Sequence, residues 1–486
     1  MSAISEADKL IQEFPSLTAK DKKMRLERLL YRDIKELDKA ERQNVYNKLE
    51  EAGIVRSSIN VCQLKGREKP DAGENHIKVE EYILSERRII YAGNKLYEYT
   101  DGVYSFLAPE RLHGYIKELV GERFTKKFAD EVKFAIQTDT YVEPDKLNDT
   151  PLLNLKNGLF DLETYELKPH SPEVLSTIQL NVSYNPNAEP RKFIQFMDEI
   201  CEGVTEKIDI IQEFFGYCFQ RRSNLDKALI LIGVGANGKS VLLYVLEILL
   251  GEDNISAVPF EKFNNHFYLA NLYGKVANIS IEANAKAQVY DSTFKAVVTG
   301  DSIEVDRKFE KPFSFRPFCK LIFALNNMPR VSDTTDSYFR RLIIISLNRV
   351  FQESEQNKNL KYELVEELDG IFLWCLEGLK NLRERGGFRI TEDMLAEVAE
   401  YRKDNNSVLL FIEEECRLDS DATTVKATLY SRYVEWCERN HNRPVAQRRF
   451  GRELKDRYRT ITETRTPDRM RSWIWAGICL NTDIRT

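Results

Sequence analysis

Apolar positions in the first 53 residues recur at helical spacing among dense charge. The residues that form this series are Met24, Leu26, Leu29, Leu30, Ile34 and Leu37. Steps of three and four residues place such side chains on one face of a helix. The pattern predicts a helical preface over residues 1–64, and the polar sequence KGREKPDAGEN that follows is typical of a linker.

From residue 87 the pattern changes to strand-like alternation. The sequence RRIIYAGNKLYEYTDGVYSFL alternates apolar and polar residues and has turn signals at Gly93-Asn94 and Asp101-Gly102, which predicts a β-meander. Residues 108–140 have helical spacing, and NLKNGLFDLETYELKPHSP predicts a second small β-unit with a turn at Asn157-Gly158. We therefore expect an α+β domain over 77–190, followed by a helical collar over 191–225.

Strand-like apolar runs dominate the middle of the chain. Ala228–Ile232 precedes a glycine-rich segment, and further runs occur in GKVANISIEAN, KLIFALNNMP and SYFRRLIIIS. Buried strands interleaved with helical patterns indicate a mostly parallel sheet. These runs predict an α/β core over 226–350, and helical patterns then continue over 351–404.

The C-terminal residues, 405–486, form a separate pattern. The sequence VKATLYSRYVEWCERNHNRPVAQRRFGRELKDRY predicts helix, turn and helix, and RTITETRTPDRMRSWIWAGICL predicts a hairpin around TPDR. This order is typical of a winged helix. The whole chain is thus predicted to be a multi-domain α/β protein with an α+β N-terminal region and a C-terminal winged helix.

Composition narrows the class of protein. No apolar run approaches the roughly 18 residues of a membrane span, and the start MSAISEADKLIQEFPS is charged, so we expect a cytoplasmic protein with no membrane partner. The eight cysteines include no CxxC pair, and the five histidines form no cluster. Neither a disulfide framework nor a zinc site is indicated, and the cysteines are interpreted as reduced core thiols.

Charge is distributed unevenly. The net charge is −6, but Asp421–Thr486 contains 14 Lys and Arg against 8 Asp and Glu, so the rest of the chain carries −12. A basic module therefore follows an acidic body.

The sequence LIGVGANGKS matches the P-loop pattern G-x-x-x-x-G-K-[ST], with Gly233, Gly238, Lys239 and Ser240 at the fixed positions. It lies between a strand-like run and the helical pattern SVLLYVLEILLG, as the motif requires. Glycines let backbone N–H groups surround a phosphate, and the helix N-terminus adds its positive dipole end. The alternative is a chance glycine turn before a core helix.

This match predicts ATP and Mg²⁺ as cofactors. Lys239 would reach the β- and γ-phosphates, and Ser240 would ligate the metal. The expected nucleotide-binding residues are Gly233, Gly235, Ala236, Asn237, Gly238, Lys239, Ser240 and Val241.

Three further features follow the P-loop pattern in order. Glu282 ends a strand-like run, where a carboxylate could hold a metal-bound water or act as a base, and Asn326 ends the next run, where it could orient the attacking water. Arg340 and Arg341 precede a third strand, from which a guanidinium could enter a neighbouring subunit's site. Each feature alone is also compatible with a turn former or a solvated strand end.

The ordered series GVGANGKS, GKVANISIE, FKAVVTGDSIEVDRKFEKPFSFRPFCKLIFALNNMP and FRRLIII resembles the AAA+-like ATPase core of superfamily 3 helicases, in particular the phage, plasmid and poxvirus primase-helicase branch. The upstream sequences NLKNGLFDLETYELKPHSPEVLS and IIQEFFGYCFQ are similar to the domain that this family carries there. The resemblance implies a homohexameric ring that moves 3′ to 5′ along single-stranded DNA. It also implies a sensor role for Asn326 and an arginine finger at Arg340 or Arg341, of which Arg341 is favoured because it directly abuts the strand.

Two departures from the family pattern are visible. The second nucleotide motif often has paired acids, whereas Ile281 precedes a lone Glu282, so completion of the metal's second shell stays open. Many members begin with a primase-polymerase domain, but the stretch before residue 75 is too short and too helical for one. We therefore expect a helicase that relies on a separate primase.

Two segments are candidates for DNA binding. GDSIEVDRKFEKPFSF predicts a hairpin with Arg307, Lys308 and Phe309 near its tip, which suits single-stranded backbone and bases, although a solvated hairpin has the same spacing. The resemblance places this hairpin in the pore of the ring. In the C-terminal module, the basic residues Arg448, Arg449, Arg452, Lys455, Arg469 and Arg471 cluster on the second helix and the wing.

The leading functional hypothesis is an ATP-dependent replicative helicase of a phage, plasmid or mobile island, which acts on single-stranded and forked DNA and could also bind an origin duplex as the initiator. The main alternative is a P-loop ATPase that remodels or packages without unwinding. A small-molecule kinase and an initiator with a vestigial ATPase are weaker alternatives, separable by strand displacement and DNA-stimulated hydrolysis.

Overall fold

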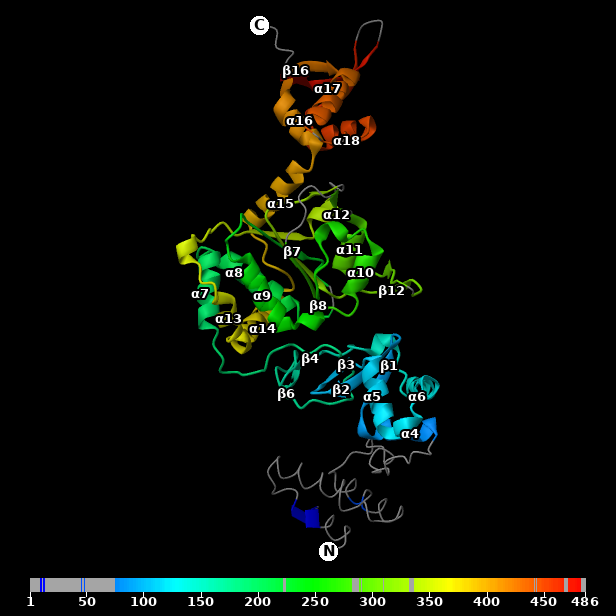
Figure 1. Cartoon of the computed structure of the whole chain (residues 1–486). Coiled ribbons are helices and arrows are strands. Elements are labelled where there is room, and N and C mark those ends of the chain that lie inside the picture. Colours follow the sequence, from blue (N-terminus) through cyan, green and yellow to red (C-terminus); the bar gives the residue numbers. More distant parts are fainter. Residues whose placement is uncertain are drawn as a thin grey trace. The chain divides into compact units, whose positions relative to one another are not determined.

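The structure is a computed structural model, and it describes residues 75–221, 224–281, 288–289, 291–308, 310–331, 336–440, 442, 444–466 and 471–481, together with positions 9, 10, 12, 13, 45 and 48. Contacts divide the chain into two compact units, Met1–Gln179 and Leu180–Thr486 (Figure 1). Apart from the six isolated positions, the predicted helical preface lies outside the described residues.

The first unit contains the predicted meander. The strands β1 (Ile89–Ala92), β2 (Lys95–Thr100) and β3 (Val103–Phe106) form an antiparallel sheet in that order. Both turns contain two residues with positive φ, for example 55° at Gly93 and 63° at Asn94, as tight hairpin turns require. The helices α4 (His76–Glu86), α5 (Pro109–Val120) and α6 (Lys126–Asp139) share one apolar core with this sheet.

The predicted second β-unit is also present in the first unit. Its strands β4 (Leu152–Leu155), β5 (Gly158–Asp161) and β6 (Leu167–Lys168) are antiparallel and adjacent in sequence order. A Cβ added at Gly158 would lie 2.5 Å from the backbone oxygen of Lys168, so only glycine fits between these two strands.

In the second unit, helices from before and after the central strands pack closely. They are α7 (Arg191–Ile200), α8 (Thr205–Tyr217), α13 (Leu360–Val365) and α14 (Leu368–Arg385). A Cβ at Gly216 would lie 2.3 Å from the oxygen of Cys375, and one at Gly378 would lie 2.4 Å from the oxygen of Gln212. The two glycines therefore let the backbones of α8 and α14 touch.

Sequence periodicity predicts one helix over 362–387, but the structure has two, α13 and α14. The chain turns at Glu366 and Glu367, and the Glu367 carboxylate accepts the backbone N–H groups of Lys192 and Phe193 at 3.1 and 3.0 Å. These groups belong to the first turn of α7, which has no intrahelical acceptors. The break thus supplies a carboxylate cap for a neighbouring helix.

The centre of the second unit is a parallel sheet of five strands with the order β15-β7-β13-β9-β8. Its strands are β7 (Ala228–Ile232), β8 (Ile255–Ser256), β9 (Ala277–Ile281), β13 (Lys320–Leu325) and β15 (Leu342–Ser346). One face, including Ile230, Phe323 and Ile344, shares an apolar core with α11 (Asp291–Thr299). Figure 1 shows α9 (Lys239–Leu250) on the other side of the sheet.

Helix α15 (Glu392–Asp404) is fixed to this core through its C-terminal end. The hydroxyl of Tyr401 donates to the oxygen of Pro329 at 2.7 Å, and the Oδ1 atom of Asn405 accepts the N–H of Val331 at 2.8 Å. Tyr401 is buried in the same apolar core as the sheet.

The C-terminal residues form a small domain with its own core. Its elements are α16 (Ser407–Glu415), β16 (Cys416–Val425), α17 (Lys426–Arg439), α18 (Gln447–Arg457), β17 (Thr462–Arg465) and β18 (Trp473–Leu480). The sheet is antiparallel with the order β16-β18-β17, and Tyr433, Trp436 and Trp475 fill the core. The two helices and the hairpin occur in the predicted order. Strand β16 was not predicted, because its sequence, CRLDSDATTV, is mostly polar and exposed and lacks the alternation of apolar and polar residues.

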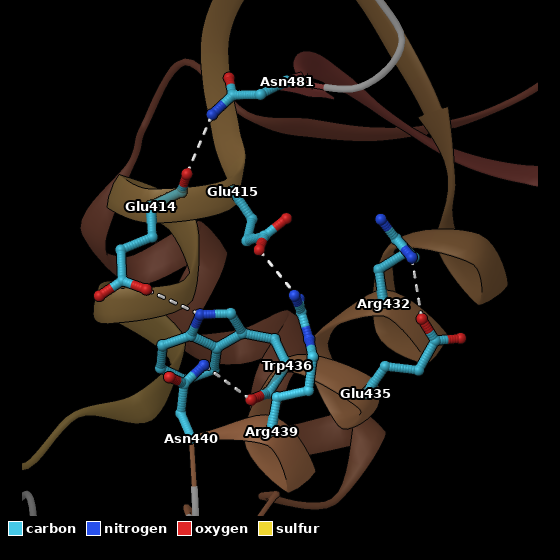
Figure 2. A network of polar contacts seen from close by, with 8 residues as sticks. All are labelled: Glu414, Glu415, Arg432, Glu435, Trp436, Arg439, Asn440 and Asn481. Carbon is cyan, nitrogen blue, oxygen red and sulfur yellow. Dashed lines mark hydrogen bonds and ion pairs between the residues drawn. The ribbon is translucent and has the colours of Figure 1, made fainter.

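Polar contacts hold the first elements of this domain together (Figure 2). The indole N–H of Trp436 donates to the Glu414 carboxylate at 2.9 Å, and Arg439 pairs with Glu415 at 2.9 Å. The side-chain amide of Asn481 donates to the backbone oxygen of Glu414 at 3.1 Å. The end of α16 is thereby tied to α17 and to the residue that follows β18.

Two predictions from composition concern membrane spans and the state of the cysteines, and the described parts of the chain bear on both. No helix there is long and apolar enough to cross a membrane. Of the cysteines in those parts, six are buried and Cys479 is half-buried, and all seven are free thiols.

Candidate nucleotide-binding site and DNA-binding surfaces

The glycine loop, residues 233–238, connects β7 to α9 at the carboxyl end of the sheet. Gly235, Ala236 and Gly238 have φ values of 52°, 47° and 84°. This backbone is left-handed at three positions, which is costly for Ala236 and points to a conformational demand on the loop. A Cβ at Gly238 would lie 2.6 Å from Cγ2 of Ile200, so the start of α9 is packed directly against α7.

Contacts from both neighbouring strands hold the loop in place. The N–H of Gly233 donates to the oxygen of Leu325, the last residue of β13, at 3.2 Å. The N–H of Phe351, beyond β15, donates to the oxygen of Ala236 at 2.8 Å, and the Asn237 side chain donates to the oxygen of Leu347 at 3.1 Å. The unusual backbone of the loop is thus fixed by the sheet.

Lys239 is the buried charge of this site. Its Nζ atom donates to the oxygen of Gly233 at 2.7 Å and to Oδ1 of Asn237 at 2.9 Å, and its exposed fraction is 5%. Burial lowers the pKa of this ammonium below its ordinary value. Ser240 is exposed in the first turn of α9, next to the loop, and Val241 is half-buried.

Strand register places one further predicted residue near this edge of the sheet. Leu325 pairs with Ile232, so the exposed Asn326 follows β13 directly beside the start of the glycine loop. Ile281 ends the next strand, β9, at the same carboxyl edge. Glu282, which follows it in the sequence, lies outside the described residues.

Arg340 and Arg341 lie at the opposite, amino edge of the sheet, just before β15. Arg340 is exposed, whereas Arg341 is buried and donates from Nη1 to the backbone oxygen of Ser337. The Nε atom of Arg341 is buried without a hydrogen-bond partner. Arg340 is exposed at the surface, whereas Arg341 is buried. This difference does not support the expectation that Arg341 is the arginine finger.

The predicted hairpin is present as β11 (Ile303–Val305) and β12 (Phe313–Phe315). The Arg307 guanidinium lies 4.6 Å from the ring centroid of Phe313 and 5.5 Å from that of Tyr273, and it pairs with Glu310 at 3.7 Å. Lys308 is exposed at the tip. Phe309 lies outside the described residues.

The predicted basic residues of the C-terminal domain differ in their surroundings. Arg448 and Arg452 are exposed on α18, whereas Arg449 pairs with Glu453 at 2.7 Å. Lys455 pairs with the Glu463 carboxylate, which also accepts from Lys426. Arg471 is exposed on the hairpin, and Arg469 lies outside the described residues.

Sequence reasoning missed two kinds of residue. His266 and Tyr273 support the hairpin from outside it: Nδ1 of His266 lies 2.7 Å from the oxygen of Glu304, and the ring of Tyr273 packs edge-on against Phe315. No local signal marks these two positions. Trp473 has 47% of its surface exposed, and its signal, the alternation in WIW, is visible in the sequence.

The fold and the loop geometry define an α/β protein with a parallel central sheet and a glycine loop at the carboxyl edge. Three family models match parts of the chain: "D5 N terminal like" over residues 82–202, a family of unknown function (DUF5906) over 231–341, and "Poxvirus D5 protein-like" over 403–461. Among solved structures, the A form apo structure of the NrS-1 C-terminal region covers 84% of this chain and 100% of its own. The TM-score is 0.50 at 14% identity, which shows a shared fold.

Curated viral relatives bear helicase names. L207/L206 of Acanthamoeba polyphaga mimivirus is 25% identical over 224 residues, and 121R of Invertebrate iridescent virus 3 is 25% identical over 233 residues; each match covers 44% of this chain. The matched parts are 23% and 24% of those two proteins, so the chain spans about a quarter of their length. Together with the two matching D5 domain models, these relatives support a D5-like primase-helicase family protein.

Proposed function

We propose that this protein is an ATP-dependent DNA helicase that works in the replication of a phage, plasmid or mobile genetic island. The observation that carries the proposal is the buried Lys239 ammonium, which the glycine loop holds at the start of α9. A lysine in this position, beside a helix N-terminus and a left-handed glycine backbone, suits the phosphates of a nucleotide. The helicase names of the viral relatives favour DNA unwinding as the work that hydrolysis drives.

The residues present fit ATP and Mg²⁺. Lys239 would bind the β- and γ-phosphates in exchange for its contacts with Gly233 and Asn237, and Ser240 would ligate the metal together with Glu282. When bound, the nucleotide would supply a cleavable phosphoanhydride bond, and the metal would offset the negative charge that develops on the phosphate oxygens as this bond breaks. Asn326, which follows β13 beside the loop, would orient the attacking water.

The arginine finger would come from a second copy of the chain. Arg340 is the better candidate because it is exposed, whereas Arg341 is buried within its own subunit. A finger in trans requires a second subunit at each site, and a closed ring supplies one to every site. We propose a homohexamer that moves 3′ to 5′ on single-stranded DNA.

Two surfaces would contact DNA. Lys308, exposed on the β11–β12 hairpin, would grip the single strand in the ring's pore, and Arg307 would stiffen the hairpin by its contacts with Phe313 and Tyr273. The C-terminal domain, with the element order of a winged helix, would bind duplex DNA through Arg448 and Arg452, including an origin duplex. Arg449, Lys455, Arg469 and Arg471 are secondary candidates there.

Strand displacement on forked DNA tests this function. Wild-type protein is expected to hydrolyse ATP, to do so faster with single-stranded DNA, and to displace the strand of a fork that has a 3′ tail for loading. Lys239→Ala should lose all three activities, whereas Lys358→Ala, which removes an exposed lysine elsewhere, should lose none. If DNA stimulates hydrolysis but no fork loses a strand, the helicase proposal fails, and a remodelling or packaging ATPase becomes the better interpretation.

A further inference from the structure

The exposed tryptophan of the C-terminal hairpin lies on the helix-facing side of its sheet. Arg465 pairs with Trp473 across β17 and β18, and Glu463 pairs with Trp475. Directly paired residues and residues two apart share a face of a sheet. Trp473 therefore continues the row that Trp475 begins.

The two tryptophans differ in what covers them. Trp475 is 1% exposed in the domain core, and a Cβ added at Gly451 of α18 would lie 3.1 Å from its ring. Trp473 is 47% exposed. The row of indoles thus runs from the core out to the surface, where an apolar ring of this size is expensive to leave in contact with water.

Cations gather around the exposed indole. The Arg465 guanidinium lies 4.5 Å from the ring centroid of Trp473, and Nζ of Lys426 lies 5.7 Å from it. Lys426 also lies 4.7 Å from the ring centroid of Trp475 and is held by the Glu463 carboxylate. Arg471, two residues before Trp473, is exposed. The surface around Trp473 therefore joins an aromatic ring to positive charge.

We propose that Trp473 stacks on an unpaired nucleobase, with Arg465 and Arg471 contacting the adjoining phosphates. This inference rests on the proposed DNA binding of the C-terminal domain and specifies its substrate as DNA with a junction between duplex and single strand. Every base has a π-face for an indole, and the flanking phosphates need cations. The base must be unpaired because bases within a duplex already stack on their neighbours.

A nucleic acid suits this surface better than an apolar partner. The ring is bordered by Arg465, Lys426 and Arg471, and the surrounding segment, Asp421–Thr486, has an excess of positive charge. Burying these cations against an apolar protein surface would cost their hydration, whereas a phosphate backbone would pair with them.

The test compares a blunt DNA duplex with the same duplex that carries a single-stranded tail, bound to the full chain without nucleotide. Wild-type protein should prefer the tailed duplex, and a 2-aminopurine at the first unpaired position should lose fluorescence as it stacks. Trp473→Ala should weaken binding of the tailed duplex by about tenfold and abolish the quenching. It should leave blunt-duplex binding within about twofold, since Arg448 and Arg452 on α18 are intact.

Two further variants make the test specific. Trp473→Phe should restore most of the preference and the quenching because phenylalanine still stacks. Phe134→Ala, which removes a 70% exposed aromatic ring from α6, should behave as wild type. Equal binding of both duplexes by the wild type, or a tail preference unchanged in Trp473→Ala, would overturn the stacking role and leave duplex binding standing. If the wild type binds neither DNA, the proposed DNA-binding function of this domain fails as well.

Discussion

Arg340 and Arg341 are neighbours in the chain, yet one is exposed and the other has only 8% of its surface accessible. The difference arises because Arg341 folds back onto the short helix α12 (Asp336–Phe339), where Nη1 reaches the oxygen of Ser337. The backbone oxygen of Arg341 also accepts the N–H of Ala228 and starts the pairing of β15 with β7. Arg341 thus supports the sheet edge, while Arg340 faces outward.

The first prediction separates these two arginines. Arg340→Ala should change the free energy of unfolding by less than about 0.5 kcal/mol, as is usual for an exposed side chain. It should keep ATP binding and lower kcat by a factor on the order of 10³, as loss of an arginine finger does. Arg341→Ala should destabilise the fold by about 1–3 kcal/mol, because it removes a buried hydrogen-bonded group. Urea unfolding and steady-state hydrolysis measure these effects.

Mixing subunits checks that the finger acts in trans. Arg340→Ala and Lys239→Ala proteins, each inactive alone, should recover part of the hydrolysis rate when combined, because some interfaces then join an intact loop to an intact finger. Mixtures that stay inactive at all ratios would refute a shared site.

A second prediction concerns Asn237, whose side chain links Lys239 to the oxygen of Leu347. Asn237→Ala should raise the dissociation constant for ATP about tenfold, since a buried carbonyl loses its donor and the loop loses a brace to the strand beyond it. Val234→Ala, at an exposed position of the same loop, is the matched control. Equal affinities for the two variants, measured by titration calorimetry, would count against this brace.

The third prediction tests Lys308 on the hairpin. Lys308→Ala should keep the basal hydrolysis rate, lose most of the stimulation by single-stranded DNA, and fail to unwind a fork, because the proposed contact of the hairpin with phosphates is lost. Arg307→Ala should instead reduce thermal stability of the hairpin region, since its guanidinium packs on Phe313 and Tyr273. Normal strand displacement by Lys308→Ala would eliminate the pore role of the hairpin.

A fourth prediction concerns pH. Lys320 is buried, its Nζ donates to the oxygen of Phe318 at 2.8 Å, and burial lowers the pKa of this ammonium to about 8. The unfolded chain, with the ordinary higher pKa, then binds more protons between about pH 8 and pH 10, so stability should rise with pH across this window, by at most about 1.4 kcal/mol per unit. Lys320→Met should lack this rise. Urea unfolding of both proteins at several pH values measures this difference. If the free energy of unfolding changes with pH to the same extent in both proteins, the prediction is contradicted.

The elements that were predictable from the sequence have strong local patterns. The strand Ala228–Ile232 is found at its predicted bounds because five consecutive apolar residues before a glycine loop leave few alternatives. The turn at Gly93-Asn94 follows from residues that tolerate positive φ. Elements stabilised by distant partners were not predictable, such as β8, which is two residues long and pairs with β9.

The same distinction holds for the candidate site. The glycine loop and Lys239 are contiguous in sequence, so their pattern predicts their proximity. Which of Arg340 and Arg341 is exposed depends on Ser337 and on the packing of α12, and no local pattern encodes that choice. The exposure of Trp473 was not predictable because strands commonly bury alternate tryptophans, as this strand does with Trp475.

The attachment of α15 determines how a mechanical load would travel. DNA pulled against the C-terminal domain would exert tension on the chain between α16 and α15, and the first anchors it meets are Asn405, bonded to Val331, and Tyr401, bonded to Pro329. The oxygen of Pro329 and the N–H of Val331 belong to the segment between β13 and α12, which leads on to Arg340. A tug on the DNA would therefore reach first the part of the chain that leads to Arg340, the proposed finger.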